Sequence, residues 1–122
     1  MKNILIVDDS AFARRTLKQI LEEGGFNVEE AKDGQDAIER YYLRRPDLVL
    51  LDMVMEGMGG LEVLRKIREL DPAAEVVIAT ADIQNATETE ARQIGAAGYL
   101  RKPFNPQEVL DTINKVLTGG VR

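Results

Sequence analysis

Short apolar segments alternate with longer amphipathic segments along the whole chain. The apolar segments are rich in Val, Ile and Leu, and two of them, "LVLL" and "VVIA", are apolar at every position. Strands that helices cover on both faces have this pattern, so a parallel sheet is indicated. We predict strands over Asn3–Val7, Phe26–Ala31, Leu48–Leu51, Glu75–Ala79 and Gly98–Arg101.

The segments between these strands have helical period. Ala13, Leu17, Ile20 and Leu21 lie on one face of the first, which follows Ser10 as an N-cap and stops at Gly24-Gly25. We predict helices over Ala11–Glu23, from Asp33-Gly34 to a point before Pro46, over Leu61–Leu70, over about Gln84–Ile94, and from Asn105-Pro106 to Gly119-Gly120.

Five βα units in 122 residues predict a single-domain α/β fold, a doubly wound five-stranded parallel sheet with its core over about residues 2–117. A solenoid is disfavoured because the units share no side-chain motif, whereas half of a (β/α)-barrel stays an alternative. We expect the order 2-1-3-4-5, a common order for such sheets that flavodoxin also has.

The composition excludes several kinds of chemistry. The chain has neither cysteine nor histidine, so thiol catalysis, disulfides and imidazole-based triads are excluded. Its net charge of −5, from 16 basic and 21 acidic residues, argues against direct nucleic-acid binding. The first apolar run is too short for a signal peptide or a membrane span, so we expect a cytoplasmic protein with no membrane insertion.

Polar residues follow the strands at their carboxyl ends, where doubly wound sheets bind ligands. Asp8 and Asp9 follow the first strand, Asp52 the third, Thr80 the fourth and Lys102 the fifth. With the order 2-1-3-4-5, these five side chains converge on one pocket. Singly, each also fits a helix cap or a solvated turn, but their joint placement favours a site.

The residue types at these strand ends suit phosphoryl chemistry. Three neighbouring carboxylates repel one another, and Mg²⁺ relieves that repulsion because it prefers carboxylate, water and phosphate oxygens. A lysine and a hydroxyl suit a phosphoryl group, and an aspartate beside such a metal is a plausible nucleophile. The pattern therefore predicts a Mg²⁺-assisted phosphoryl site with an aspartate acceptor.

The motifs "IVDDS", "LVLLDMVM", "VIATA" and "GYLRKPF" occur in this order and spacing. In them the chain resembles the response-regulator receiver domain, the CheY-like family, over about Lys2–Leu117. The strand order used above is that of this family. The resemblance implies a phosphoacceptor switch and not a metabolic enzyme.

The resemblance also implies a role for each matching residue. Asp52 is the implied phosphoacceptor; Asp8, Asp9, Asp52 and the backbone carbonyl of Val54 are the implied Mg²⁺ ligands; Thr80, Ala81 and Lys102 are the implied phosphoryl contacts. Thr80 and Tyr99 match the switch pair, and Lys102-Pro103 matches a cis peptide bond. Phe12, near the site mouth, is either a kinase contact or a core-edge residue.

The implied partners belong to two-component signalling. The phosphoryl donor is a phosphohistidine on a sensor histidine kinase or a histidine phosphotransfer protein. A downstream protein binds the face made by the helix over Gln84–Ile94, the strand over Gly98–Arg101 and the last helix, as in chemotaxis or a phosphorelay. The protein is then a monomer or a phosphorylation-dependent dimer. We expect a stand-alone receiver, and the alternative is the receiver of a longer DNA-binding or enzymatic regulator.

A remote alternative is a phosphatase of the haloacid dehalogenase-like type. Such enzymes have a D-x-D motif, but Val54 stands two residues after Asp52, where the second acid is needed.

One position departs from the family pattern. Glu56 stands four residues after Asp52, where the family usually has proline. With Gly57, Gly59 and Gly60 nearby, we expect a freer loop with an added negative charge and altered phosphorylation kinetics. Val54 and Asp82 occupy the positions that the resemblance links to the hydrolytic water.

Overall fold

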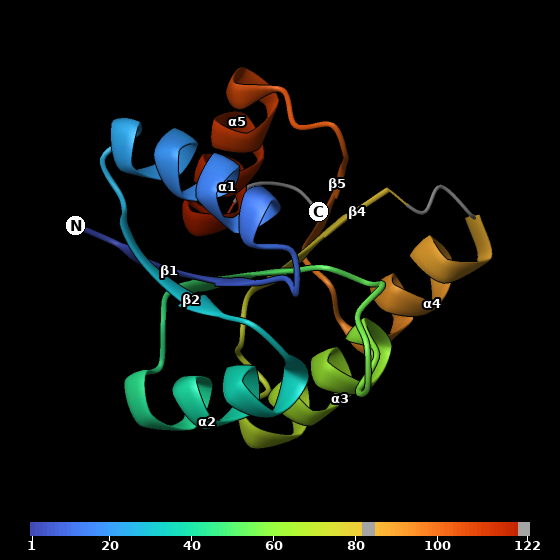
Figure 1. The fold of residues 1–122 in the computed structure, drawn as a ribbon. Helices are drawn as coiled ribbons and strands as arrows, with labels where there is room; N and C mark the ends of the chain where they lie inside the picture. Colours follow the sequence, from blue (N-terminus) through green and yellow to red (C-terminus); the bar gives the residue numbers. More distant parts are fainter. Residues whose placement is uncertain (82–84, 120–122) are drawn as a thin grey trace.

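A five-stranded parallel sheet forms the centre of the molecule (Figure 1). The computed structural model describes residues 1–81 and 85–119. The strand order is β2-β1-β3-β4-β5, as predicted. The strands are β1 (Asn3–Val7), β2 (Asn27–Ala31), β3 (Leu48–Leu51), β4 (Val76–Thr80) and β5 (Gly98–Arg101).

Each strand is followed by a helix, so the predicted doubly wound α/β fold is confirmed. The helices are α1 (Ala11–Glu23), α2 (Gly34–Arg44), α3 (Gly60–Leu70), α4 (Asn85–Ile94) and α5 (Pro106–Leu117). The predicted bounds differ from these by one or two residues at a few ends. Gln84, the predicted start of the fourth helix, lies outside the described residues.

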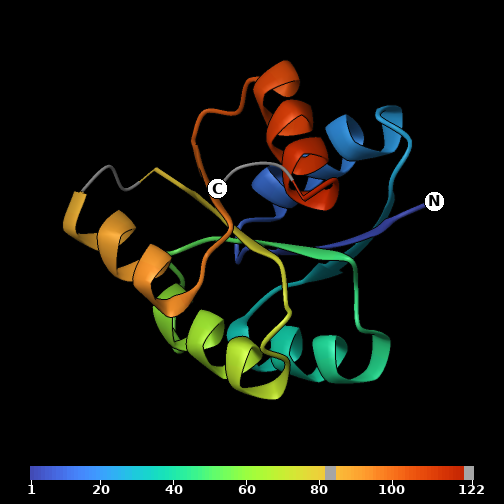
Figure 2. The same ribbon diagram turned by 180° about the vertical axis from the view of Figure 1, so that it is seen from behind.

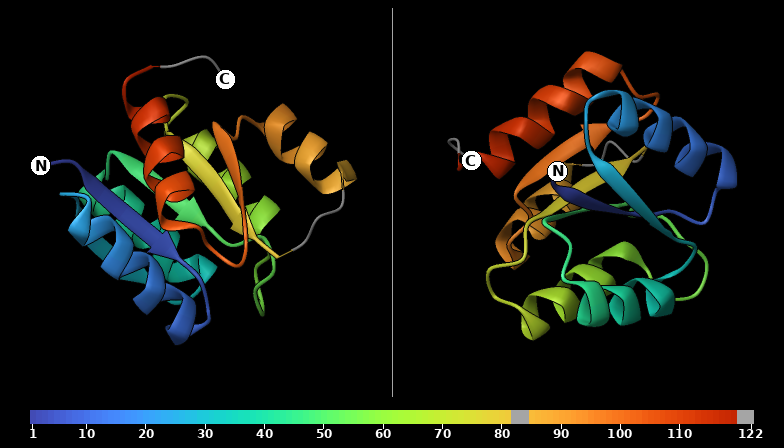
Figure 3. Two further views of the ribbon diagram at one scale, coloured as in Figure 1. Left: turned by 90° about the horizontal axis from the view of Figure 1, so that it is seen from above. Right: turned by 90° about the vertical axis from the view of Figure 1, so that its left-hand side faces the viewer.

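Helices cover both faces of the sheet. Figure 1 shows α1 and α5 above the sheet and α2 and α3 below it, and Figures 2 and 3 show the same layers from other sides. Alternate strand residues serve the two faces: Ile4 and Ile6 pack into the core with α1 and α5, whereas Leu5 and Val7 pack into the core with α2, α3 and α4. This explains why the central strands are apolar at every position.

The edge strand β2 is less buried than the central strands, and it carries two glutamates, Glu29 and Glu30. Glu30 faces α1 and pairs with Arg14 at 3.1 Å, whereas Glu29 faces α2 and lies 3.7 Å from Arg44. Charged side chains on an edge strand discourage pairing with another chain.

Helix caps agree with the sequence signals. The side chains of Ser10, Asp33 and Asn105 accept the backbone N–H of the third residue of α1, α2 and α5, respectively. Pro106 occupies the first position of α5. Each cap therefore fixes where a helix begins after the carboxyl end of the preceding strand.

Of the helices in the described part of the chain, none has the length and apolar character needed to cross a membrane.

A polar cluster ties α2 to the turn after α3. The Tyr41 hydroxyl donates to Asp71 Oδ2 at 2.8 Å, and Arg45 Nη1 lies 3.3 Å from the same oxygen. Burial, followed by the hydrogen bond to Asp71, raises the pKa of Tyr41 far above its ordinary value. Hydrogen bonds from Tyr41 and from the Ala73 N–H lower the pKa of Asp71.

We expect Tyr41→Phe to lower the free energy of unfolding by about 1 kcal/mol at pH 7, because it removes a hydrogen bond to a partly exposed carboxylate. The contribution of Asp71 is present above its unfolded pKa of about 3.9 and is lost as the pH falls through its lower folded value. The penalty should therefore be constant between about pH 5 and 8 and smaller at pH 3. Urea denaturation measures it, with Tyr42→Phe as control because Tyr42 is 64% exposed. Equal effects of the two variants would contradict the role of this cluster.

Candidate functional site

The carboxyl ends of β1 and β3 bring three aspartates together. β1 and β3 are neighbours, and the Asp52 N–H donates to Val7 O at 2.9 Å, which extends the pairing beyond Leu51. One carboxylate oxygen from each of Asp8, Asp9 and Asp52 lies within 4.8 Å of the others. Asp8 is 2% exposed and Asp52 is 6% exposed, whereas Asp9 is exposed. Two buried acids and one accessible acid form an open-ended anionic pocket.

Lys102, directly after β5, supplies the positive charge of this pocket. Its Nζ atom lies 2.8 Å from Asp8 Oδ2 and 3.5 Å from Asp52 Oδ2. Burial alone lowers the pKa of Lys102, but the hydrogen bond to Asp8 and the charges of both aspartates outweigh burial and raise this pKa overall. Lys102 is therefore a firmly held cation between the two buried acids.

Asp52 is electrostatically disfavoured in its ionised form. Burial raises the pKa of Asp52, and the charge of Asp8 raises it further. Lys102 and the Val54 N–H, 3.4 Å from Asp52 Oδ1, only partly offset these effects. One cation for three carboxylates leaves the pocket with excess negative charge, which favours a further cation.

The backbone after β1 is held by contacts from two other elements. The Ser10 N–H donates to Asp8 Oδ1 at 2.9 Å, and Arg14 Nη1 donates to the Asp8 carbonyl at 2.6 Å. Arg14 also contacts Glu30 of β2 through its Nε atom. Arg14 and Glu30 were not among the predicted site residues. Arg14 stands one helical turn after Ser10, and this spacing alone could have placed it next to the end of β1.

The start of α3 approaches the end of β3 very closely. A Cβ atom on Gly60 would lie 2.6 Å from both the Asp52 carbonyl oxygen and the Met53 Cα atom, so only glycine fits there. The Gly60 N–H donates to Met53 O at 3.1 Å. The loop after Asp52 is therefore closed at its base.

The remaining predicted residues lie on β4 and β5 or directly after these strands. Thr80 is fully buried at the end of β4, and Ala81 after it is exposed. Tyr99 is partly buried and pairs in register with Ile78, two residues before Thr80, so Tyr99 and Thr80 lie on the same face of the sheet. The Lys102–Pro103 peptide bond is cis.

Two further residues from the sequence predictions are largely exposed. Phe12, at the start of α1, is 76% exposed, and Val54, two residues after Asp52, is 63% exposed. Asp82 lies outside the described residues.

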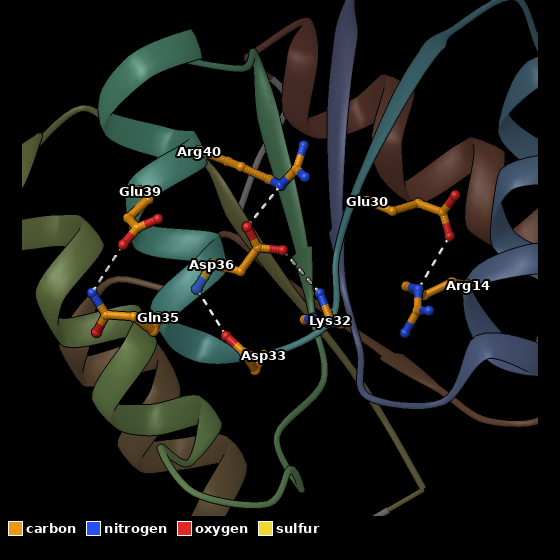
Figure 4. A pocket seen from close by; sticks show the side chains of 8 residues that line it. All are labelled: Arg14, Glu30, Lys32, Asp33, Gln35, Asp36, Glu39 and Arg40. Atoms are coloured by element: carbon orange, nitrogen blue, oxygen red, sulfur yellow. Dashed lines mark hydrogen bonds and ion pairs between the residues drawn. The ribbon is translucent and has the colours of Figure 1, made fainter.

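An open polar pocket of about 550 Å³ lies beside this site, between α1, β2 and α2 (Figure 4). Its side chains largely pair with one another: Arg14 with Glu30, Arg40 with Asp36, and Gln35 with Glu39. Asp33 is occupied as the N-cap of α2. This mutual pairing makes the pocket a weaker ligand site than the acidic cluster.

Comparison with known proteins agrees with this geometry. The family model of the response regulator receiver domain matches residues 4–114. The chain belongs to this family. This receiver domain is 40% identical to the chemotaxis protein CheY of Thermotoga maritima over 116 residues. The match covers 94% of this chain and 97% of that protein.

Longer regulators and solved structures match as well. The response regulator UvrY of Escherichia coli is 40% identical over 121 residues, which are 98% of this chain and 56% of UvrY. The structure of the CheX–CheY–BeF3–Mg complex from Borrelia burgdorferi aligns with a TM-score of 0.91 at 34% identity, over 94% of this chain and 88% of that one.

We expect Asp52→Asn to raise the free energy of unfolding of the metal-free receiver domain by about 1 kcal/mol at pH 7, an ordinary size for one substitution. The folded-state pKa of Asp52 is raised, so the native state favours the protonated acid, and stability is lost as the pH rises through that value. Lys102 keeps Asp8 as a partner in the variant. Urea denaturation in a chelating buffer measures the effect, and Asp111→Asn, an exposed acid on α5, is the control. A loss of stability in Asp52→Asn would contradict the expected sign.

Proposed function

We propose that this receiver domain accepts a phosphoryl group on Asp52 from a phosphohistidine of a sensor histidine kinase or a histidine phosphotransfer protein. The observation that carries the proposal is the arrangement of one buried aspartate, two neighbouring acids and one lysine within a single pocket. Receiving a phosphoryl group on a carboxylate requires a nucleophilic oxygen and compensation for the incoming negative charge. The pocket has both.

The donor set fits Mg²⁺. Three carboxylate oxygens lie within 4.8 Å of one another, and Lys102 only partly compensates their negative charge. Asp8, Asp9, Asp52 and the carbonyl of Val54 are the proposed ligands. Bound Mg²⁺ neutralises the negative charges that gather in this pocket.

Each residue of the chain then has a separate task. An oxygen of Asp52 forms the new bond to phosphorus as the bond from phosphorus to the donor nitrogen breaks. Lys102, 3.5 Å from Asp52, is placed to pair with a phosphoryl oxygen, and Thr80 and Ala81 supply a hydroxyl and a backbone N–H. Water later hydrolyses the acyl phosphate and restores Asp52.

The signal leaves through Thr80 and Tyr99 in this proposal. Both lie on the face of the sheet that packs against α3 and α4, with Thr80 at the carboxyl end of β4 and Tyr99 on the edge strand β5. Movement of Thr80 toward the phosphoryl group leaves space that Tyr99 fills. The surface of α4, β5 and α5 then changes, and a downstream protein binds it.

A longer regulator is the second candidate, because the match to UvrY covers 56% of that protein. In that setting the same phosphorylation acts on a DNA-binding or enzymatic output.

Incubation with a radiolabelled small acyl phosphate and MgCl2 should give at most one label per chain, on Asp52. We expect Asp52→Asn to lose the label by at least about 100-fold, because the amide is not a nucleophile, and Asp111→Asn to keep it. Chelation of the metal should reduce labelling to a similar extent. Sustained turnover of phosphomonoesters would instead support the phosphatase alternative and overturn the proposal.

Beryllofluoride with Mg²⁺ should activate partner binding without a kinase. We expect a bead-bound wild-type chain to retain a defined protein from its native lysate only in the activated state, and Asp52→Ala to retain none. Tyr99→Ala should weaken this retention about tenfold while leaving phosphorylation intact, because Tyr99 is neither a proposed metal ligand nor a proposed phosphoryl contact. Equal retention with and without activation would contradict a switch.

A further inference from the structure

The loop over residues 53–59 reaches from β3 to the acid at the end of β1. The Glu56 backbone N–H donates to Asp9 Oδ2 at 3.2 Å, across 47 positions of sequence. The Glu56 side chain is exposed, so the backbone and not the side chain makes this contact with the pocket.

The closed base of the loop determines where Glu56 lies. The Gly60 N–H donates to Met53 O, and Gly57 has a φ of +77°, a left-handed conformation that turns the chain directly after Glu56. Gly60 packs against the Met53 backbone too closely for any side chain. The amide of Glu56 is therefore presented to Asp9 by the backbone path and does not depend on the glutamate side chain.

Asp9 is the acid of the cluster with the fewest other contacts. Asp8 is buried and is held by the Ser10 N–H and by Lys102, and Asp52 is buried and contacts Lys102. Asp9 is exposed, and among the described residues the ion pairs of the pocket do not include it. An exposed aspartate without such a contact samples several rotamers.

We propose that Glu56 is a positioning residue whose backbone N–H holds the Asp9 carboxylate in the orientation that binds the cation. This inference rests on the proposed function. A carboxylate oxygen has two lone pairs, so Asp9 Oδ2 accepts the N–H and still has capacity for a metal. Donors that hold a ligating carboxylate commonly strengthen metal binding.

The identity of residue 56 decides whether this contact exists. Proline, the residue that the family usually has here, lacks the N–H and cannot donate to Asp9. The loop at Glu56 makes this hydrogen bond to the residue that follows Asp8 at the end of β1. The glutamate thus provides a donor that the usual residue does not.

The test compares Glu56→Pro with Glu56→Ala in an NMR titration of the full chain with MgCl2. Glu56→Ala removes the side-chain charge and keeps the N–H, so we expect its Kd to stay within about twofold of the wild type. Glu56→Pro removes both, and we expect its Kd to rise about tenfold, at the lower end of effects on metal ligation by such donors because Asp9 is exposed. Equal Kd values for the two variants would overturn the inference.

A second measurement examines the contact without changing Glu56. In the metal-free Asp9→Ala variant, the Glu56 amide proton should move upfield and exchange faster with solvent than in the wild type. An unchanged Glu56 signal would overturn the inference even if Glu56→Pro fails to fold. Failure of the proposed function has a different signature, since the wild type would then bind Mg²⁺ without accepting a phosphoryl group on Asp52.

Discussion

Repulsion among the carboxylates of Asp8, Asp9 and Asp52, answered by the ammonium of Lys102, is the interaction around which this structure is organised. The sheet places these acids side by side because β1 and β3 are neighbours, and β5 brings Lys102 to within 2.8 Å of Asp8. Two of the three acids are buried, so water screens their repulsion poorly. The pocket therefore carries a cost in the metal-free state that a cation relieves. In the proposed function, the affinity for Mg²⁺ and the cost of the metal-free state have the same physical origin.

The same charges link the pocket to the rest of the fold. Lys102 starts the segment that follows β5, and Asp8 is held through Ser10 to the start of α1. Thr80 and Tyr99 share one face of the sheet. In the proposed function, a change in charge at Asp52 acts on β4 and β5 through Thr80 and Tyr99, and the surface of α4, β5 and α5 changes as a result.

The loop at Glu56 shows how a departure from a family pattern acquires meaning only in three dimensions. In the sequence, the missing proline indicates greater freedom and an added charge. In the structure, the relevant group is the backbone N–H, which reaches an aspartate 47 positions away. Motif comparison identifies the unusual position, and the fold identifies the atom that matters there.

The sequence alone determined the element order, the doubly wound sheet and the strand-end positions of the polar residues, of which the structure brings Asp8, Asp9, Asp52 and Lys102 together. Apolar runs and strand-end positions are local signals. It also determined the N-cap at Ser10 and the helix starts at Asp33 and Asn105, for the same reason. Only the tertiary structure decided that Lys102 lies closer to Asp8 than to Asp52. The same holds for the hydrogen bond from Arg14 to the Asp8 carbonyl and for the hydrogen bond from the Glu56 N–H to Asp9. These contacts join residues from separate elements and depend on how those elements are placed in space, which helix and strand periodicity do not encode.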